Sequence, residues 1–182
     1  MRKLAYLQLW EWGVIVFLIV APVRLFIFEP FIVVGESMEP NYHSWDYLII
    51  DKLSYRLREP KRGEVIIFSP PVDPNRYYIK RIIGLPGETI VLKDDKIYIF
   101  NQEHPQGFVL QESYLPSGSH YYGELKTTLK DNEYFVLGDN REESYDSRRW
   151  GPLKKNLIVG RVLFALKPLT TFVKLIKLRG EL

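Results

Sequence analysis

Short apolar runs separated by turn residues most constrain the fold of residues 29–182. Runs rich in Val, Ile, Tyr and Phe alternate with clusters of Gly, Pro, Asp and Asn. Each run has the length of a strand rather than of a helix, and this spacing is typical of an all-β domain with mainly antiparallel sheets. The 12 Tyr and 10 Phe residues suit strands. The expected strands are residues 31–34, 47–51, 53–55, 65–68, 77–83, 89–92, 96–100, 133–137 and 157–166.

Residues 101–131 break this pattern because they are polar and carry Gly107, Pro116, Gly118 and Gly123. We expect a small β excursion from the main sheet that is partly loop, and we identify no chemistry in it. A chain of 182 residues can form one good core with a small appended lobe.

The amino-terminal end carries a long apolar run over residues 12–28, with Arg24 as its one charge. A helix of this length reaches about 25 Å, at the short end for a membrane span. Arg2 and Lys3 precede the run, so the positive-inside rule predicts a cytoplasmic amino terminus. We expect residues 1–28 to form that terminus and a single transmembrane helix.

Two alternatives to an anchor are a cleavable signal peptide and a buried core helix. No small-residue cleavage motif follows the run, since Ala21 is succeeded by Pro22. A nearly uninterrupted apolar run at an extreme terminus is unusual for a core helix. An uncleaved anchor places the compact domain, residues 29–182, on the extracytoplasmic side of the cell membrane.

Composition excludes several kinds of site. The chain has no Cys, which removes disulfides, Cys nucleophiles and thiolate metal sites. His43, His104 and His120 are far apart and lack metal-ligand spacing, so we expect no metal and no cofactor. The net charge of +3 without a basic block argues against nucleic acid as a partner.

Ser37 is the first candidate for chemistry. It follows an apolar run that ends at Gly35, and Pro40 stiffens the backbone after it. This pattern can present a serine hydroxyl on a stiff turn at the end of a strand. An ordinary polar turn is the alternative, so Ser37 needs a base.

Lys80 is the candidate base. On the expected strand it lies between Tyr78 and Ile82 on one face, and these neighbours can strip water from its amine. A free Lys has a pKa of about 10.4, which must fall by roughly 2–3 units for base catalysis near neutral pH. Arg81 has equally apolar neighbours, so the pattern alone does not choose between the two residues. Lys80 is favoured only because an arginine does not lose its proton in proteins. We expect Lys80→Ala to abolish turnover and Arg81→Ala to leave much of it.

Residues 138–151 form the third element, a polar stretch between two apolar runs. Its Asp and Arg residues can form ion pairs, and Ser144 can reach a lysine amine. The alternative is a long solvated turn. The ion-pair candidates are Asp139, Arg141, Asp146 and Arg148.

Together these stretches resemble the bacterial type I signal peptidases, membrane-bound serine proteases with a Ser/Lys dyad. The resemblance covers residues 1 to about 168 and is weakest over 101–131. Several motifs in the right order make it specific, and the last is the most specific of them. The matching stretches are residues 29–31, 37–40, 46–52, 62–68, 78–88 and, within 138–151, the positions Gly138 to Arg141, Ser144, Asp146 to Arg148 and Gly151.

The resemblance implies a role for each candidate. Ser37 would be the nucleophile that forms an acyl-enzyme, and neutral Lys80 the general base. Ser144 would orient Lys80 through a hydrogen bond. The remaining supporting residues would be Asp139, Asp146 and Arg148.

The resemblance also implies the substrate: preproteins that carry an N-terminal signal peptide, bound as an extended strand and cut outside the bilayer. The expected partners are the preprotein and the lipid bilayer, and we expect the enzyme to act as a monomer. Five residues would shape shallow pockets for small side chains at the −1 and −3 positions: Phe31, Val33, Met38, Tyr78 and Ile79.

Two positions depart from common family patterns. Gly35 stands where some members have a Ser that helps to bind the oxyanion, so the Ser37 N–H would need another backbone donor or water. Asn41 replaces the usual Thr, which puts a local side-chain hydrogen bond in doubt. The tail, residues 168–182, fits a last strand or a membrane-surface helix equally well.

Two other functions fit the same motifs less well. One is a catalytically silent β-domain that binds extended peptides at the membrane. The other is a Ser/Lys protease with a different task, such as a self-cleaving repressor or a conjugation-pilin peptidase.

Overall fold

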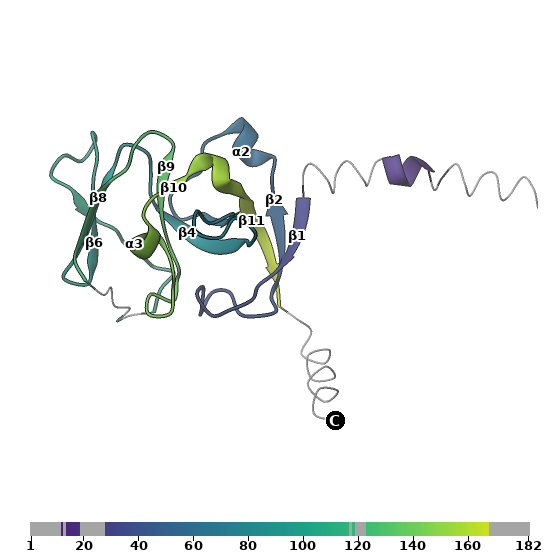
Figure 1. Cartoon of the computed structure of the whole chain (residues 1–182), viewed down its shortest axis with the longest axis horizontal. Coiled ribbons are helices and arrows are strands. Elements are labelled where there is room, and N and C mark those ends of the chain that lie inside the picture. The colour runs from purple at the N-terminus through teal and green to yellow at the C-terminus, as the bar shows by residue number, and fades with distance from the viewer. Residues whose placement is uncertain (1–11, 13, 19–27, 117, 119–122, 168–182) are drawn as a thin grey trace, which may run out of the picture.

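The computed structural model describes residues 12, 14–18, 28–116, 118 and 123–167 (Figure 1). Trp12 and residues 14–18 are helical, but most of the expected anchor over 1–28 lies outside the described residues. Within the described ranges, no helix has both the length and the apolar character needed to cross a membrane. The tail over 168–182 also lies outside them.

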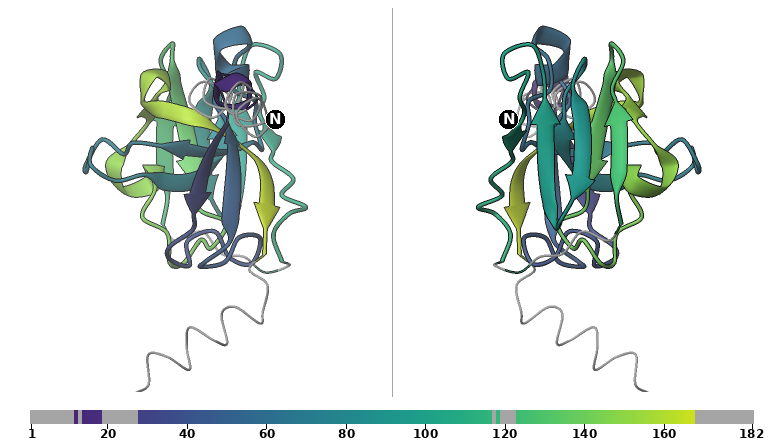
Figure 2. Two further views of the ribbon diagram at one scale, coloured as in Figure 1. Left: turned by 90° about the vertical axis from the view of Figure 1, so that its right-hand side faces the viewer. Right: turned by 90° about the vertical axis from the view of Figure 1, so that its left-hand side faces the viewer.

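A seven-stranded sheet forms the larger part of the molecule, in the order β1-β2-β11-β3-β4-β9-β10. Every neighbouring pair is antiparallel. In Figure 2, β1, β2 and the end of β11 lie side by side. The strands are β1 (Phe28–Ile32), β2 (Tyr47–Asp51), β3 (Val65–Phe68), β4 (Tyr78–Gly84), β9 (Glu133–Leu137), β10 (Leu153–Lys154) and β11 (Ile158–Leu166).

A second sheet of four antiparallel strands lies at the end of the molecule opposite β1 (Figure 1). The expected hairpin supplies its two central strands, and the excursion over 101–131 adds one short strand on each side. These strands are β7 (Phe108–Val109), β6 (Lys96–Phe100), β5 (Thr89–Lys93) and β8 (Leu125–Thr128), in the order β7-β6-β5-β8.

Besides the helical residues before β1, the described residues form three short helical turns: α2 (Ser54–Leu57), α3 (Ser147–Trp150) and η1 (Lys155–Leu157). The prediction of a strand over residues 53–55 was wrong, because α2 begins there. The carboxylate of Asp51 accepts hydrogen bonds from the backbone N–H groups of Leu53 and Ser54, both at 2.9 Å. This carboxylate satisfies N–H groups that a helix start leaves open, so it favours a turn over a strand.

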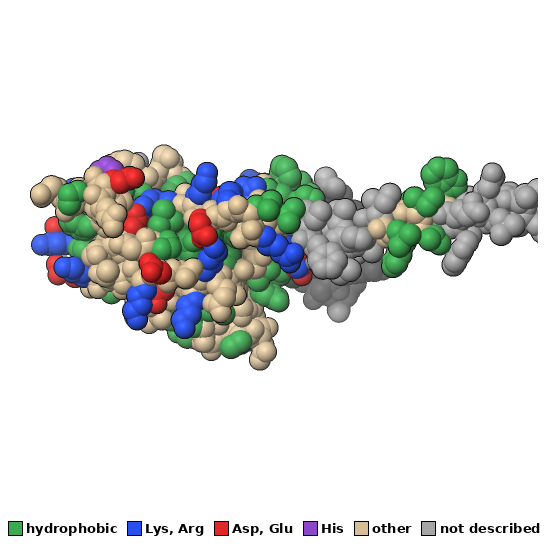
Figure 3. Space-filling model, turned by 90° about the horizontal axis from the view of Figure 1, so that it is seen from above, with side chains coloured by type: hydrophobic (Ala, Val, Ile, Leu, Met, Phe, Trp, Pro, Cys, Tyr) green, Lys and Arg blue, Asp and Glu red, His purple; other side chains and the backbone are tan. Residues whose placement is uncertain are grey.

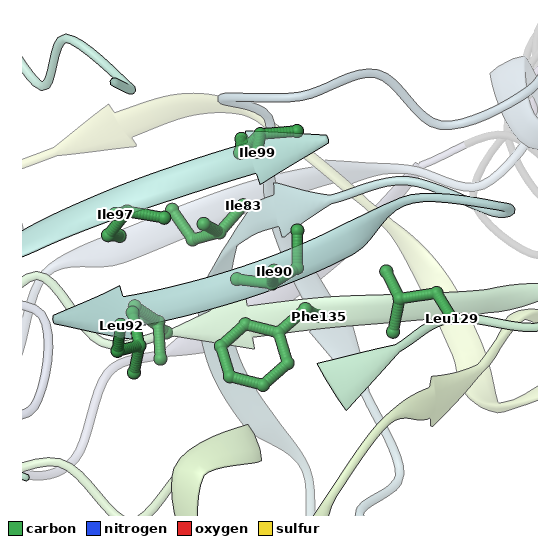
Figure 4. Packing of buried hydrophobic residues seen from close by; sticks show 8 residues of the cluster. Ile83, Ile90, Leu92, Ile97, Ile99, Leu129 and Phe135 are labelled. Atoms are coloured by element: carbon green, nitrogen blue, oxygen red, sulfur yellow. The ribbon is translucent and has the colours of Figure 1, made fainter. Parts of the chain in front are cut away.

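The core sits on both sides of the main sheet. Successive side chains of β3 are all buried and alternate between two clusters, Val65 and Ile67 in one and Ile66 and Phe68 in the other. A third cluster fills the space between the sheets (Figure 4). Strand β4 contributes to all three clusters, and Lys80 is therefore a buried amine in an apolar strand.

The surface is mixed in charge. Seen from above, Lys and Arg side chains lie interspersed with Asp and Glu side chains (Figure 3). This face therefore has no single dominant sign of charge.

Candidate active site

Ser37 lies on a turn that follows β1. Gly35 has φ of +104°, a region that favours glycine, although a Cβ there would meet no atom within 4 Å. The hydroxyl of Ser44 fixes the turn, since it accepts from Gly35 N at 2.9 Å and donates to Gly35 O at 3.1 Å. Backbone conformation rather than lack of space therefore explains the glycine.

Lys80 approaches Ser37 from β4. Its Nζ lies 2.6 Å from Ser37 Oγ and 2.9 Å from the backbone oxygen of Ile79, and only 3% of the residue is exposed. In the ammonium form this nitrogen donates to the hydroxyl. In the neutral form it can accept the hydroxyl proton instead.

Burial favours the neutral form of Lys80. Desolvation lowers its pKa to about 8, and nearby Arg148 acts in the same direction. The carboxylates of Asp146 and Asp139 oppose this, because negative charge favours the ammonium. A useful fraction of the amine is therefore neutral close to neutral pH.

Ser144 does not make the expected hydrogen bond to Lys80. Its Oγ is buried and has no hydrogen-bond partner among the described residues. Instead it lies against Gly138, where an added Cβ would come within 2.2 Å of Ser144 Oγ and 2.3 Å of Ser37 O. The backbone at Gly138 thus runs between the two serines.

Asp146 and Arg148 form the expected pair. Arg148 donates from Nε and Nη2 to the two carboxylate oxygens, at 2.8 and 2.9 Å. The same fully buried carboxylate accepts from Arg148 N at the start of α3 and from Gly138 N at 3.1 Å. Asp146 therefore joins α3 to the loop beside Ser37.

Asp139 pairs with Arg81, which the sequence analysis weighed only as an alternative to Lys80. Arg81 Nε and Nη2 donate to Asp139 at 2.8 and 2.5 Å. Asn41 Nδ2 donates to the same carboxylate at 2.8 Å and to Tyr114 O at 2.9 Å. Asn41 therefore makes two long-range hydrogen bonds, and one of them ties the Ser37 turn to Asp139.

A groove of about 570 Å³ runs from Ser37 and Lys80 along β1 and the start of β4. Its described lining includes four of the five expected pocket residues: Phe31, Val33, Tyr78 and Ile79. Sequence reasoning missed several others, which are also apolar or lie on the same strands. These include Ile32, Leu48, Ile67, Tyr77 and Tyr145.

Met38 is not among the described groove-lining residues, and its expected part in shaping a pocket stays a prediction. It is 1% exposed and packs in the core cluster that contains Val33, Leu48 and Ile79. A flexible, unbranched side chain fills the core beneath the turn.

No metal site is apparent in the described ranges, since no three His, Asp or Glu side chains gather there in a suitable cluster. What the geometry does provide is a buried amine against a hydroxyl at the end of an apolar groove. Nucleophilic catalysis needs this pairing of nucleophile and base.

Comparison with known proteins points in the same direction. The family described as "Signal peptidase, peptidase S26" matches residues 6–167. A probable signal peptidase I-2 from Synechocystis is 36% identical over 169 residues, which cover 90% of this chain and 74% of that protein. Signal peptidase I V from Bacillus subtilis is 35% identical, over 81% of this chain and 91% of that protein.

A signal peptidase I from Bacillus caldolyticus is 36% identical over 90% of this chain and 92% of its own length. A crystal structure of a signal peptidase I from Enterococcus faecalis V583 is 33% identical, has a TM-score of 0.48, and covers 59% of this chain and 98% of that one. From the family match and the three relatives compared by sequence, we conclude that this chain belongs to the signal peptidases of peptidase family S26, which are serine hydrolases.

Proposed function

We propose that this chain is a membrane-anchored serine endopeptidase that removes N-terminal signal peptides from exported preproteins. The observation that carries the proposal is the 2.6 Å contact between Lys80 Nζ and Ser37 Oγ at the end of the groove. Ser37 is the nucleophile and Lys80 the general base. Both come from one chain, so a monomer holds the complete pair.

The reaction runs through an acyl-enzyme. Neutral Lys80 takes the proton of Ser37 Oγ as this oxygen attacks the scissile carbonyl. The tetrahedral intermediate then expels the amine of the mature protein, which receives the proton from Lys80. Neutral Lys80 next takes a proton from water as the water oxygen attacks the ester. Collapse of this second tetrahedral intermediate releases the signal peptide, and Lys80 gives the proton to the leaving Ser37 Oγ.

The backbone N–H of Ser37 suits the developing oxyanion. Within the described part of the chain it donates no hydrogen bond, so it is available to the substrate. Gly35 adds no hydroxyl there, and a second donor comes from backbone or water. A donor of this kind contributes roughly 3–4 kcal/mol to the transition state in other enzymes.

The edge of β1 suits an extended substrate. Val33 uses both of its backbone groups on the neighbouring segment, donating to Asp46 O at 3.0 Å and accepting from Trp45 N at 2.8 Å. Because backbone groups alternate in direction along a strand, those of Ile32 and Val34 point away, toward the open edge of the sheet. A signal peptide can add there as a strand, with small side chains at −1 and −3 entering the apolar groove.

An exposed apolar face supports the lipid bilayer as a partner. Ile32, Tyr47 and Leu166 are cross-strand neighbours on β1, β2 and β11, and they are 55%, 41% and 58% exposed. Phe164 lies opposite Ile49 in the adjacent row and is 64% exposed. Contiguous exposed apolar surface of this kind marks protein or membrane contacts. Part of this apolar face lies on β1, the strand that follows the expected anchor. In this proposal the groove beside β1 therefore lies outside the membrane but close to it.

The direct test is cleavage of a preprotein with an Ala-x-Ala site by the full-length chain in detergent. Mass spectrometry should find a single cut after the second Ala. Ser37→Ala should lose this activity, whereas Ser113→Ala, which alters an exposed serine, should keep it. Retained cleavage in Ser37→Ala would rule out the mechanism. Binding without cleavage by the parent would favour a peptide-binding domain.

A further inference from the structure

Two residues of the excursion, Glu112 and Tyr114, contact the active-site segments. The ring of Tyr114 faces the guanidinium of Arg81, with Cζ 3.9 Å from the ring centroid. The backbone oxygen of Tyr114 accepts from Asn41 Nδ2 at 2.9 Å. One excursion residue therefore contacts both the strand that carries Lys80 and the turn that carries Ser37.

Arg81 is held from several directions. The Tyr114 ring covers one face of its guanidinium, Asp139 accepts from Nε and Nη2, and Gly63 O accepts from Nη1 at 2.9 Å. The side chains of Arg81 and Asp139 are 11% and 0% exposed. A planar cation in such a site depends on the ring as well as on the carboxylate, because stacking fixes its orientation.

The excursion also holds the polar loop that contains Asp139. Glu112 accepts from Arg141 Nη1 and Nη2 at 3.0 and 2.6 Å, and Arg141 Nε donates to Gly138 O at 2.8 Å. The hydroxyl of Tyr114 donates to Glu112. Glu112 and Arg141 are 8% and 1% exposed in their side chains, so this pair is also internal.

That loop in turn binds the backbone of the turn that carries Ser37. Asn140 N donates to Ser37 O at 3.1 Å, and Asn140 Nδ2 donates to Glu36 O at 3.2 Å. A continuous set of contacts therefore runs from Tyr114, through Arg81 and Asp139, to the backbone of Ser37.

We propose that Tyr114 is a positioning residue for the Ser37–Lys80 pair: its ring holds Arg81 on Asp139 and so keeps the nucleophile turn in register with the base. This inference rests on the proposed function of that pair. It gives the excursion a part in catalysis.

The same contacts control the charge near the base. The charged groups that act on Lys80 are Asp146, Asp139 and Arg148. Asp139 favours the ammonium form, and Arg81 offsets its charge. When Arg81 loses its stacking partner, it offsets less of the negative charge of Asp139. That charge then stabilises the ammonium form of Lys80 more strongly, and Lys80 retains its proton to higher pH.

Tyr114→Leu tests the proposal because it keeps apolar volume but removes the aromatic face. We expect kcat to fall about tenfold with KM nearly unchanged, since misplacement of a reacting group affects the chemical step. We also expect the acid limb of kcat/KM to move to higher pH. Tyr114→Phe, which keeps the ring, should recover most of both.

Tyr98→Leu is the matched control, since Tyr98 is half-buried on β6 in the same small sheet. An unshifted acid limb in Tyr114→Leu, an equal shift in Tyr98→Leu, or no recovery in Tyr114→Phe would each overturn the proposal.

An NMR titration of Lys80 in lysine-labelled protein separates this proposal from the proposed function. If the parent cuts no preprotein, the proposed function fails, and the titration alone decides about Tyr114. A higher Lys80 pKa in Tyr114→Leu than in the parent supports the positioning role, and an equal pKa overturns it.

Discussion

Arg81 and Asp139 form a forked ion pair beside the catalytic candidates, with Nε and Nη2 of the arginine 2.8 and 2.5 Å from the two carboxylate oxygens. The adjacent strand residue, Lys80, contacts Ser37 instead. The two neighbouring basic residues therefore differ in charge state. A buried carboxylate stabilises the charged form of Arg81, whereas burial favours the neutral form of Lys80.

The first prediction concerns this ion pair. Arg81→Ala should lower the free energy of unfolding by about 3–5 kcal/mol, because it leaves Asp139 buried without its partner. Denaturant unfolding measures the change. The earlier expectation that Arg81→Ala keeps much of its turnover stays a prediction, and it should be measured per folded molecule.

Arg76→Ala is the control for the loss of an arginine. Its pair with Asp73 is on the surface, with side chains 75% and 37% exposed, and surface pairs contribute about 0–1 kcal/mol. Equal destabilisation of the two variants would contradict the buried-pair argument. Adding Asp139→Asn to Arg81→Ala should recover part of the stability.

The second prediction is the pH dependence of cleavage. Only neutral Lys80 can accept the Ser37 proton, so kcat/KM should rise with pH and level off above the lysine pKa of about 8. A profile of kcat/KM between about pH 6 and 10 measures this acid limb, the range over which activity rises with pH. A limb near the pKa of an ordinary lysine, about 10.4, would mean that burial does not tune this amine.

The third prediction concerns stability. The pKa of Lys80 is about 8 in the folded chain, below its ordinary value of 10.5, so the unfolded state binds more protons between these two pH values. Stability of the parent should therefore rise with pH across that window. Below about pH 8 the protonated amine carries the full cost of burial, about 3 kcal/mol.

Lys80→Met removes this cost. The variant should be inactive and more stable than the parent at pH 7, and its advantage should shrink as the pH rises toward 10.5. Chemical denaturation at several pH values checks the trend. An advantage that grows with pH would have the wrong sign for a lysine with a lowered pKa.

The fourth prediction compares two glycines of the site. Gly138→Ala should reduce kcat by at least about 100-fold, because a Cβ 2.3 Å from Ser37 O must displace the nucleophile turn. Gly35→Ala meets no atom within 4 Å and has only the strain of positive φ, a cost of about 1–3 kcal/mol. We therefore expect Gly35→Ala to retain much more activity per folded molecule. The reverse order would show that backbone conformation outweighs the clash.

Local sequence patterns were sufficient for most strands. The predicted strands over residues 47–51, 65–68 and 133–137 coincide with β2, β3 and β9, because each is an apolar run with turn residues at its ends. Strand β1 begins earlier than predicted, at Phe28, since pairing of Glu29 and Pro30 with β2 extends it. Only the tertiary partner gives that information.

The site was predictable where chemistry restricts the choice of residue. Ser37 and Lys80 were selected as the types that can serve as nucleophile and base, and the fold brings them together. The arginine that pairs with Asp139 was not predictable, because Arg81 and Arg141 are equally suitable in sequence and only packing selects Arg81. Tyr114 lies in a polar stretch without periodicity, so no local signal marks its ring as a partner of the site.

The contacts at the site also have a consequence for the order of events in folding. Ser37 and Lys80 are 43 positions apart, and the bonds from Asn41 to Asp139 and from Asn140 to Glu36 span 98 and 104 positions. Such distant segments join only after long loops have closed. A nascent chain without its last third contains Ser37 and Lys80. It lacks the loop around Asp139 and Asn140 that positions them. We therefore expect the Ser37–Lys80 pair to reach its final geometry late in folding.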